Sequence, residues 1–267
     1  MDTKHVKVLL AEWGLENSRS VSSPGVAIEK AHEEKKKDEE EKLNSADAKK
    51  YRRAAARINY MALDRADLGF SAKEAASEMA NPSVGDVVRL KRIMRYLVGA
   101  KRVYTLFQWQ DADSTLRVYT DSDWAGCSKT RKSTSGGMIM RGSHLIHHWT
   151  SSQATIALSV AEAELNALVK GAAEAISLYN MSLECGMTFK IDLYTDSSSA
   201  KGIIHREGCG KVKHLEVRQL WIQDVIHRKE VKAMKIPREY NCSDAMTHCW
   251  SCKDGLRHFR YAGLRWV

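Results

Sequence analysis

The spacing of apolar residues divides the chain into a helical first part and a mixed second part. In several segments up to Val98, apolar positions recur every three or four residues, which is the period of an amphipathic helix, while Asn17–Gly25 is rich in Ser and is expected to be a loop. This pattern predicts helices over Lys4–Leu15, Ala46–Leu63, Ala72–Met79 and Val84–Val98. Pro82 and Ser83 stand before the last of these, and Ser83 is the expected N-cap.

After Lys101 the pattern changes to alternation, which is typical of strands. We predict strands over Leu116–Thr120, Gly136–Met140, Leu145–Trp149, Ile191–Thr195 and Val231–Ile236. Helices are expected over Ala157–Leu183, Ser198–Glu207, Lys213–Arg228 and Cys242–Trp250. The resulting order, β-β-β-α-β-α-α-β-α, predicts an α/β fold in which helices flank a mixed sheet of five strands.

The charge pattern adds two features. Glu29–Lys42 is almost entirely Glu, Lys and Asp, so it is either a solvated helix or a disordered linker. Lys and Arg outnumber Asp and Glu by 42 to 33, a formal net charge of +9, and such a surface concentrates polyanions such as nucleic acid. Basic residues flank the apolar stripe of the Val84–Val98 helix and either contact phosphates or form a solvated face: Arg89, Lys91, Arg92 and Arg95.

The cellular compartment follows from what the sequence lacks. Its six cysteines are scattered, no secretory leader follows Met1, and no window approaches the ~20 apolar residues of a membrane helix. We therefore expect free thiols in a reducing compartment, cytoplasm or nucleus, rather than secretion.

Four acidic residues stand at the ends of predicted strands or near the starts of predicted helices. Asp121 and Asp196 each come directly after a predicted strand that ends in Tyr-Thr, and each is followed by Ser. If these strands are neighbours, both carboxylates lie at the same edge of the sheet. Glu164 borders the apolar stripe of the long helix, where a carboxylate is costly unless it is paired or metal-bound. Asp244 begins the last predicted helix.

Such a set of carboxylates suits a metal-dependent nuclease. Clustered carboxylates repel one another, and Mg²⁺, which prefers oxygen ligands, cancels that repulsion. Two ions roughly 4 Å apart can clamp a scissile phosphate. Taken singly, each carboxylate is better explained as a turn residue, a helix cap or the partner of a Lys. Their joint order and their settings favour the nuclease.

Six motifs in chain order carry a family resemblance. They are Tyr119–Gly126 (YTDSDWAG), Lys132–Gly136 (KSTSG), the run from Trp149–Gln153 to Glu162–Glu164, Tyr194–Asp196, Lys213–Arg218 with Trp221 and Gln223, and Ser243–Thr247 (SDAMT). Together they resemble the ribonuclease H (RNase H) domain that ends the Pol polyprotein of copia-type retrotransposons. Lys4–Gly25 resembles the end of the reverse transcriptase, its thumb. Tyr51–Ala62 and Asn81–Gly99 resemble the connection that leads to RNase H.

The resemblance implies an RNase H-like fold and assigns Asp121, Glu164, Asp196 and Asp244 as catalytic and metal-binding residues for two Mg²⁺ ions, which Mn²⁺ could replace. Glu162 is the competing choice for Glu164. The implied division is a thumb-like remnant over 1–27, a charged linker over 28–45, a helical connection over 46–105, the RNase H-like domain over 106–254 and a tail over 255–267.

Three positions depart from the family pattern. Ala66 stands where the family often has Pro between Arg and Asp, and His248 stands where it often has Lys. The Glu29–Lys42 run has no family counterpart. None of these affects the four carboxylates.

The implied activity is endonucleolytic hydrolysis of the RNA strand of RNA/DNA hybrids, as part of retrotransposon reverse transcription, within a virus-like particle in the cytoplasm or nucleus. The polymerase palm is missing, so no reverse transcription is expected from this chain alone, and a polymerase region is an expected partner. Candidate contacts to the substrate backbone, each equally explicable as a turn residue, are Lys129, Arg131, Lys132, Ser133, Thr134, Ser197, Ser198 and Ser199.

Other interpretations remain open. The chain could be an inactive retroelement remnant that binds nucleic acid through its basic surface. An integrase-type nuclease is disfavoured because that class has the order Asp, Asp, Glu. Cys249 and Cys252 form a single Cys-x-x-Cys, too little for a common zinc finger. His147 and His148 should point to opposite faces of their strand and are interpreted as structural.

Overall fold

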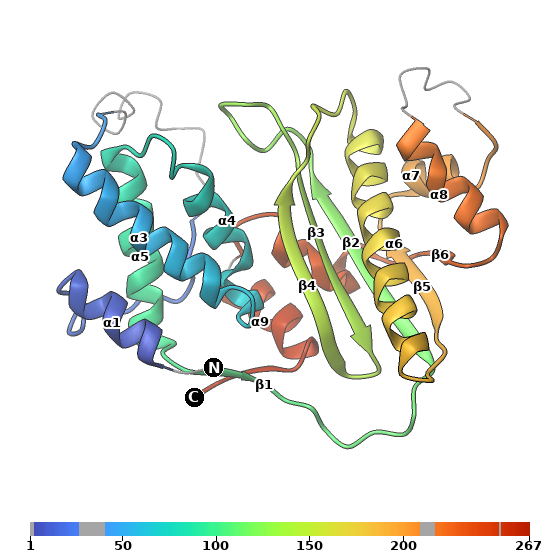
Figure 1. The fold of residues 1–267 in the computed structure, drawn as a ribbon, viewed down its shortest axis with the longest axis horizontal. Coiled ribbons are helices and arrows are strands. Elements are labelled where there is room, and N and C mark those ends of the chain that lie inside the picture. Colours follow the sequence, from blue (N-terminus) through green and yellow to red (C-terminus); the bar gives the residue numbers. More distant parts are fainter. Residues whose placement is uncertain (1–2, 27–40, 209–216, 251) are drawn as a thin grey trace. The chain divides into compact units, whose positions relative to one another are not determined.

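The computed structural model describes residues 3–26, 41–208, 217–250 and 252–267 (Figure 1). The chain forms two compact units. The first, called here the helical unit, consists of Met1–Thr105, His248–Phe259 and Leu264–Val267. The second, the sheet unit, consists of Leu106–Thr247 and Arg260–Gly263. Residues 255–267, expected as a tail, carry most of one helix and a strand.

The helical unit is built from amphipathic helices whose apolar faces pack together. Its helices are α1 (Lys4–Glu12), α3 (Ser45–Met61), α4 (Gly69–Ser77), α5 (Val84–Gly99) and most of α9 (Cys252–Tyr261), with a 3₁₀ turn at Ala66–Leu68. Two short strands, β1 (Val103–Thr105) and β7 (Leu264–Trp266), pair antiparallel. These strands had no signal in the sequence pattern, because each is only three residues long.

Local hydrogen bonds explain where the helices of this unit begin. The Ser83 hydroxyl accepts a hydrogen bond from the Asp86 backbone N–H, and the Asp86 carboxylate accepts one from the Ser83 backbone. This capping box confirms the predicted N-cap of α5. Asn44 caps α3 in the same way, accepting from the Asp47 backbone at 2.9 Å.

A buried ion pair lies in the core of the helical unit. The Arg65 guanidinium donates to both carboxylate oxygens of Asp67, at 2.7 and 2.5 Å, and to the carbonyl of Ala100 at 3.1 Å. The Tyr96 hydroxyl donates to the same carboxylate at 2.7 Å. Ala66, which stands where the family often has Pro, therefore lies between the two residues of this buried ion pair, Arg65 and Asp67, and both are retained.

The sheet unit contains the predicted mixed sheet of five strands, in the order β4-β3-β2-β5-β6. Its strands are β2 (Thr115–Asp123), β3 (Thr134–Arg141), β4 (His144–Ser152), β5 (Lys190–Thr195) and β6 (Lys232–Lys235). The first three form an antiparallel meander, and β5 and β6 are added parallel to β2. The predicted fold class is therefore confirmed.

Three α-helices complete the sheet unit: α6 (Val160–Glu184), α7 (Ser198–Ile204) and α8 (Val217–His227). The core between α6 and the sheet includes Val118, Leu193, Leu165 and Leu168, none of them more than 5% exposed. Gly171 allows α6 to approach the sheet closely, since a Cβ at this position would lie 2.4 Å from the Thr120 Cγ2. The predicted start of α8 at Lys213 lies outside the described residues.

The prediction of one helix over Cys242–Trp250 is wrong. The segment instead forms a 3₁₀ turn, η3 (Cys242–Met246), after another at Arg238–Tyr240. The Ser243 hydroxyl donates to the side chain of Asn241 at 2.7 Å. Such side-chain hydrogen bonds compete with helix formation. In the described part of the chain, no helix has an apolar stretch long enough to cross a bilayer.

Candidate active site

The two Tyr-Thr-Asp sequences lie side by side at one edge of the sheet. Strands β2 and β5 are parallel neighbours, with Thr115 opposite Lys190 and Tyr119 opposite Tyr194. The offset is 75 residues (194 − 119), so Asp121 and Asp196 occupy equivalent positions (121 + 75 = 196). The prediction that these strands are neighbours is confirmed. Carboxylate oxygens of Asp121, Glu164 and Asp196 lie within 4.8 Å of one another.

Glu164 reaches this edge from the second turn of α6. The backbone N–H and hydroxyl of Ser122 donate to its Oε1 at 3.2 and 2.9 Å, which ties the helix to the end of β2. Its Oε2 is buried and has no hydrogen-bond partner among the described residues. An unpaired buried carboxylate oxygen is costly, and a cation is a partner that this position could accept.

Glu162, the competing choice, has a different role. It is the third residue of α6, where its Oε2 accepts a hydrogen bond from the Leu158 backbone at 2.8 Å. Its own backbone N–H donates to the hydroxyl of Ser159, the N-cap residue, at 3.2 Å. Glu162 therefore stabilises the start of the helix, and it is not among the three carboxylates gathered at the sheet edge.

Asp244 is brought to Asp121 by η3, and their carboxylate oxygens lie within 4.8 Å of each other. Hydrogen bonds anchor this turn on both sides of Asp244. The Asn241 side chain donates to the carbonyl of Thr120 at 3.0 Å, and the Thr247 hydroxyl donates to the Asp121 carboxylate. The Asp244 carboxylate also forms an ion pair with Arg238 at 3.2 Å. Asp244 is thus held near the cluster and shares its charge with a surface arginine.

Gly136 makes room for this turn. It stands opposite Asp121 on β3, and a Cβ there would lie 2.6 Å from the Met246 Cβ and 2.8 Å from the Thr247 Cγ2. Any larger residue at position 136 would push η3 away from the sheet, and Asp244 with it.

Burial and mutual repulsion dominate the electrostatics of the cluster. Burial raises the pKa of Glu164 to about 7, against the opposing hydrogen bond from Ser122. Burial, and then the charge of Glu164, raise the pKa of Asp121 well above its usual value. Burial also raises the pKa of Asp196, while Arg238 opposes the rise. The ionised cluster is therefore unfavourable without a counter-charge.

The donor set suits a hard divalent cation. The gathered ligands are all carboxylate oxygens on a strand, a helix and the end of a second strand, and Glu164 Oε2 lacks a partner. Mg²⁺ prefers such oxygen ligands and usually retains several of its waters. The residues present therefore fit the metal that the sequence predicts, and Asp121, Glu164 and Asp196 would hold it.

Comparison with known proteins relates the whole chain to mobile elements. No protein-family model matches it. Over 248 residues, 91% of this chain, it is 29% identical to the retrovirus-related Pol polyprotein from transposon TNT 1-94 of Nicotiana tabacum, of which it covers 18%. Over 208 residues it is 24% identical to the polyprotein from transposon RE1 of Arabidopsis thaliana, of which it covers 14%. The chain is thus similar to the retrovirus-related Pol polyproteins of plant transposons, of which it spans less than a fifth.

A shorter relative and two solved structures are also similar. The chain is 32% identical over 129 residues to secreted RxLR effector protein 161 of Plasmopara viticola, covering 48% of this chain and 90% of that protein. LC11-RNase H1, isolated from compost, is 17% identical with a TM-score of 0.36, covering 50% of this chain and 93% of its own. The foamy viral protease-reverse transcriptase is 13% identical with a TM-score of 0.41. The match covers 73% of this chain and 27% of that chain. The sheet unit itself has the strand order β4-β3-β2-β5-β6.

The residues predicted from the sequence to contact substrate differ in exposure. Lys129 and Arg131 are exposed in the loop between β2 and β3, and Lys132 is half-buried. Ser133 and Thr134 are at most 1% exposed. The Ser133 hydroxyl accepts a hydrogen bond from the Ala125 backbone at 3.0 Å, so it holds the loop together. Of this group, the structure leaves the three basic side chains within reach of a ligand.

The serines after Asp196 form the start of α7. Ser197 is its N-cap and accepts a hydrogen bond from the Ala200 backbone at 3.1 Å. The Ser198 hydroxyl accepts a hydrogen bond from Lys235, and Ser198 and Ser199 are exposed. The capping role of Ser197 is local structure, whereas Ser198 and Ser199 remain accessible beside the cluster.

Several residues that organise the site were not singled out from the sequence. Three of them hold the carboxylates or their turn in place by hydrogen bonds, and one balances their charge: Ser122, Thr247 and Asn241, and Arg238. Ser122 and Thr247 do lie inside the motifs quoted for the resemblance, adjacent to or three residues from a carboxylate. Arg238 lies in no such motif, and its role depends on the turn that the sequence did not predict.

Cys249 and His147 belong to no group of metal-ligating side chains among the described residues. No group of three or more metal-ligating side chains among the described residues includes a cysteine. The side chain of Cys252 lies outside the described residues, so the Cys-x-x-Cys stays a hypothesis. His147 lies 3.7 Å from Glu174 and stacks on Trp149, a structural environment.

Proposed function

We propose that the sheet unit is a divalent-metal-dependent endonuclease that hydrolyses the RNA strand of RNA/DNA hybrids, a ribonuclease H of a copia-type retroelement. The observation that carries the proposal is the convergence of Asp121, Glu164 and Asp196 at one sheet edge, with a buried oxygen of Glu164 unpaired. Asp244 completes the set from η3. The homology to transposon Pol polyproteins supports the same activity.

Each of this chain's residues has a definable task. Bound Mg²⁺, with Mn²⁺ as a substitute, would supply an activated water and stabilise the leaving oxygen of the phosphodiester. Asp121, Glu164 and Asp196 would hold two such ions. Ser122 orients Glu164, and Thr247 orients Asp121, so that the oxygens that face the ions are fixed before substrate arrives. Asp244 would join them from η3.

Substrate selection would depend on shape and on the 2′-hydroxyls of the RNA strand. Lys129, Arg131 and Lys132 in the β2–β3 loop, and Ser198 beside Asp196, are the reachable candidates for backbone contacts. Because such contacts carry no base information, we expect little sequence specificity.

Cleavage of an end-labelled RNA/DNA hybrid by the purified full chain tests the proposal. In Mg²⁺ or Mn²⁺ we expect products with 5′-phosphate and 3′-hydroxyl ends, and no cleavage in EDTA. Asp121→Asn and Glu164→Gln should each lower the rate at least about a hundredfold, since even outer-shell changes at metal sites cost 10–100-fold. Glu162→Gln is the matched control: it changes a buried Glu of the same helix that caps rather than binds metal, and should retain activity.

Two results would contradict the proposal. If the folded parent bound the hybrid but did not cut it in either metal, the chain would be an inactive remnant that retains nucleic-acid binding. If Glu162→Gln lost as much activity as Glu164→Gln, the assignment of the acidic residue on α6 would be wrong.

The setting of the activity is part of the proposal. As the chain covers 18% of its tobacco relative, we propose that a reverse transcriptase polymerase region works with it on the same hybrid. We further propose action inside a retroelement particle in the cytoplasm or nucleus. One relative is named as a secreted effector, so detection of the native protein outside cells would overturn this localisation.

A further inference from the structure

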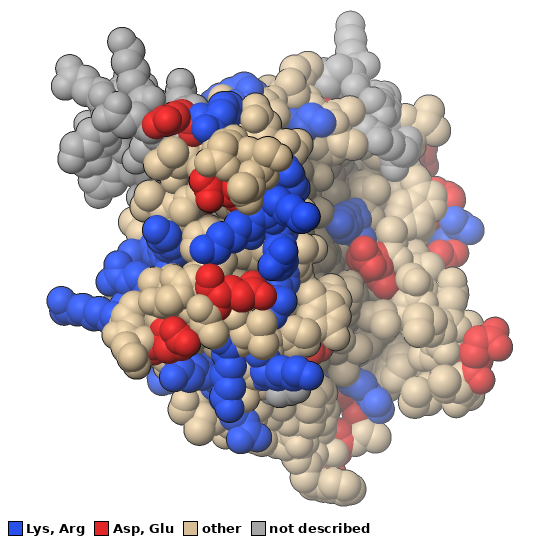
Figure 2. Space-filling model, turned by 60° about the vertical axis from the view of Figure 1, so that its left-hand side comes forward, with Lys and Arg blue, Asp and Glu red and all other residues tan. Residues whose placement is uncertain are grey.

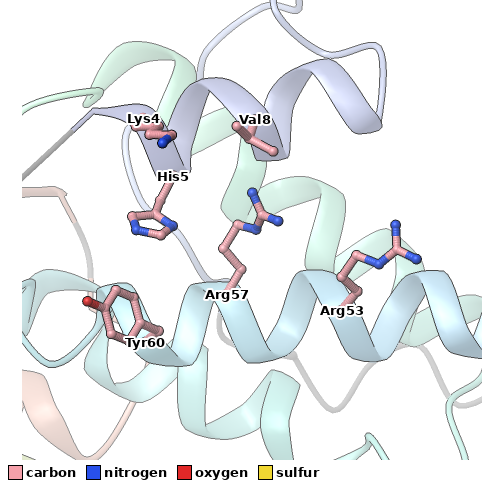
Figure 3. A pocket seen from close by; sticks show the side chains of 6 residues that line it. All are labelled: Lys4, His5, Val8, Arg53, Arg57 and Tyr60. Carbon is pink, nitrogen blue, oxygen red and sulfur yellow. The ribbon is translucent and has the colours of Figure 1, made fainter.

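A basic pocket lies between α1 and α3 of the helical unit, apart from the carboxylates just described (Figure 3). Its volume is about 500 Å³. The residues that line it are Lys4, His5 and Val8 of α1 and Arg53, Arg57 and Tyr60 of α3. Three of these six side chains are basic and two carry rings. Arg53 and Arg57 point from α3 toward α1, and the His5 ring points toward Tyr60 (Figure 3).

Basic residues outnumber acidic ones on the two helices that line this pocket. Helices α1 and α3 together hold seven Lys and Arg residues but only two acidic ones, Glu12 and Asp47. Figure 2 shows Lys and Arg side chains gathered over the face that this view brings forward. Arg53 and Arg57 stand one turn apart, an arrangement of like charges that destabilises a helix. Among the described residues Arg53 has no ion-pair or hydrogen-bond partner, and Arg57 has a 3.6 Å pair with Glu12.

The aromatic side of the pocket is also exposed. The Tyr60 side chain is 60% accessible, and its ring centroid lies 5.1 Å from that of His5. An exposed aromatic ring beside basic side chains is the combination that proteins use to stack a base while arginines hold the adjacent phosphate. The pocket thus offers arginines for a phosphate and an aromatic ring for a base within two helical turns of α3.

We propose that this pocket binds one nucleotide unit of a single-stranded nucleic acid, with the phosphate between Arg53 and Arg57 and the base against Tyr60. A strand is favoured over a free nucleotide because Lys49 and Lys50 continue the basic surface along α3 beyond the pocket. A single strand is favoured over a duplex because only an unpaired base can turn its face to a ring. The site is distinct from the proposed nuclease centre and independent of its activity.

Fluorescence anisotropy of a labelled oligothymidylate of about twelve nucleotides, titrated with the full chain in EDTA, tests this site. EDTA removes metal from the carboxylates, so binding is measured whether or not the nuclease proposal holds. Arg53→Gln should weaken binding about tenfold and lower the slope of log K against log salt by about 0.7. Arg52→Gln, the adjacent exposed arginine that does not line the pocket, makes the same charge change and should weaken binding less than about twofold.

Two further pairs of variants separate a built site from general charge. Tyr60→Leu should weaken binding about tenfold, whereas Tyr60→Phe keeps the ring and should bind like the parent. Glu12→Gln releases Arg57 and should tighten binding by more than Glu16→Gln, which removes the same charge from an exposed position outside the pocket. All these side chains are at least partly accessible, so unchanged circular dichroism is the expected folding control.

Three outcomes would overturn the proposal. Equal weakening by Arg53→Gln and Arg52→Gln would show that a diffuse basic surface binds the strand. If Tyr60→Leu bound the strand as tightly as the parent, no base would stack on Tyr60. If thymidine monophosphate competed as well as the oligonucleotide at the same concentration of nucleotides, the ligand would be a free nucleotide rather than a strand.

Discussion

Asp67 in the helical unit and Glu164 in the sheet unit are both nearly inaccessible, at 1% and 4% exposure, yet their surroundings are opposite. Asp67 accepts hydrogen bonds from a guanidinium and from the Tyr96 hydroxyl, so its charge is fully compensated. Among the residues that the structure describes, Glu164 has Ser122 as the donor to one oxygen, other carboxylates nearby, and no hydrogen-bond partner for its second oxygen. The first arrangement serves stability. The second leaves a requirement for positive charge that the protein itself does not meet.

Breaking the compensated centre should have the largest effect on stability. Asp67→Asn leaves the Arg65 charge buried without its partner and should lower the free energy of unfolding by about 3–5 kcal/mol. Urea denaturation monitored by circular dichroism measures this. Asp64→Asn, at an exposed position three residues away, should change it by less than about 0.5 kcal/mol. A loss of under 1 kcal/mol for Asp67→Asn would mean that the ion pair is not the compensated centre described.

Supplying the missing charge to the other centre should stabilise the protein. Mg²⁺ at 100 times its dissociation constant should raise the free energy of unfolding by about 2.7 kcal/mol, because it binds only the folded cluster. Thermal melts with and without Mg²⁺ measure the shift in Tm. Asp121→Asn should melt at the same temperature with and without Mg²⁺, and Glu162→Gln should respond like the parent. An equal Mg²⁺ response in Asp121→Asn would place the ion elsewhere.

The pH dependence of the metal-free protein should show the same imbalance more weakly. Burial raises the pKa of Glu164 from an ordinary 4.5 to about 7, so its contribution is most favourable below about pH 4.5 and is lost as the pH rises through 7. Between pH 5 and pH 8 the stability of the parent in EDTA should fall by about 2 kcal/mol relative to Glu164→Gln. Parallel urea titrations measure the difference. Parallel pH profiles of the two proteins would show that Glu164 titrates normally.

Much of this contrast could be predicted from local sequence. The repeated Tyr-Thr-Asp places two carboxylates at strand ends, and parallel pairing of those strands makes them neighbours. Glu164 could be chosen over Glu162 because it borders the apolar stripe, although what separates them in the structure is that Glu162 caps the helix. Because these features depend on period and position within single elements, a sequence pattern records them.

What could not be predicted depends on contacts between distant segments. The turn that carries Asp244 is shaped by Asn241 bonding to β2 and by the space above Gly136, more than a hundred residues away. For the same reason Ser133 and Thr134 were expected at the surface, although their burial comes from the folding of the loop around Asp123 and Ala125. The compensation of Asp67 also needs Tyr96 and Ala100, which no local pattern joins to it.

The helical unit is discontinuous along the chain, and this sets the order in which the protein can be assembled during synthesis. Residues 106–247 of the sheet unit emerge from the ribosome before the segments that complete the first unit. Strand β1 therefore cannot pair with β7 until about 160 further residues have been synthesised. Contacts of such sequence separation form slowly. The N-terminal helices of this unit therefore finish folding after the sheet unit, and a premature stop near residue 248 would leave their apolar surface exposed to chaperones and proteases.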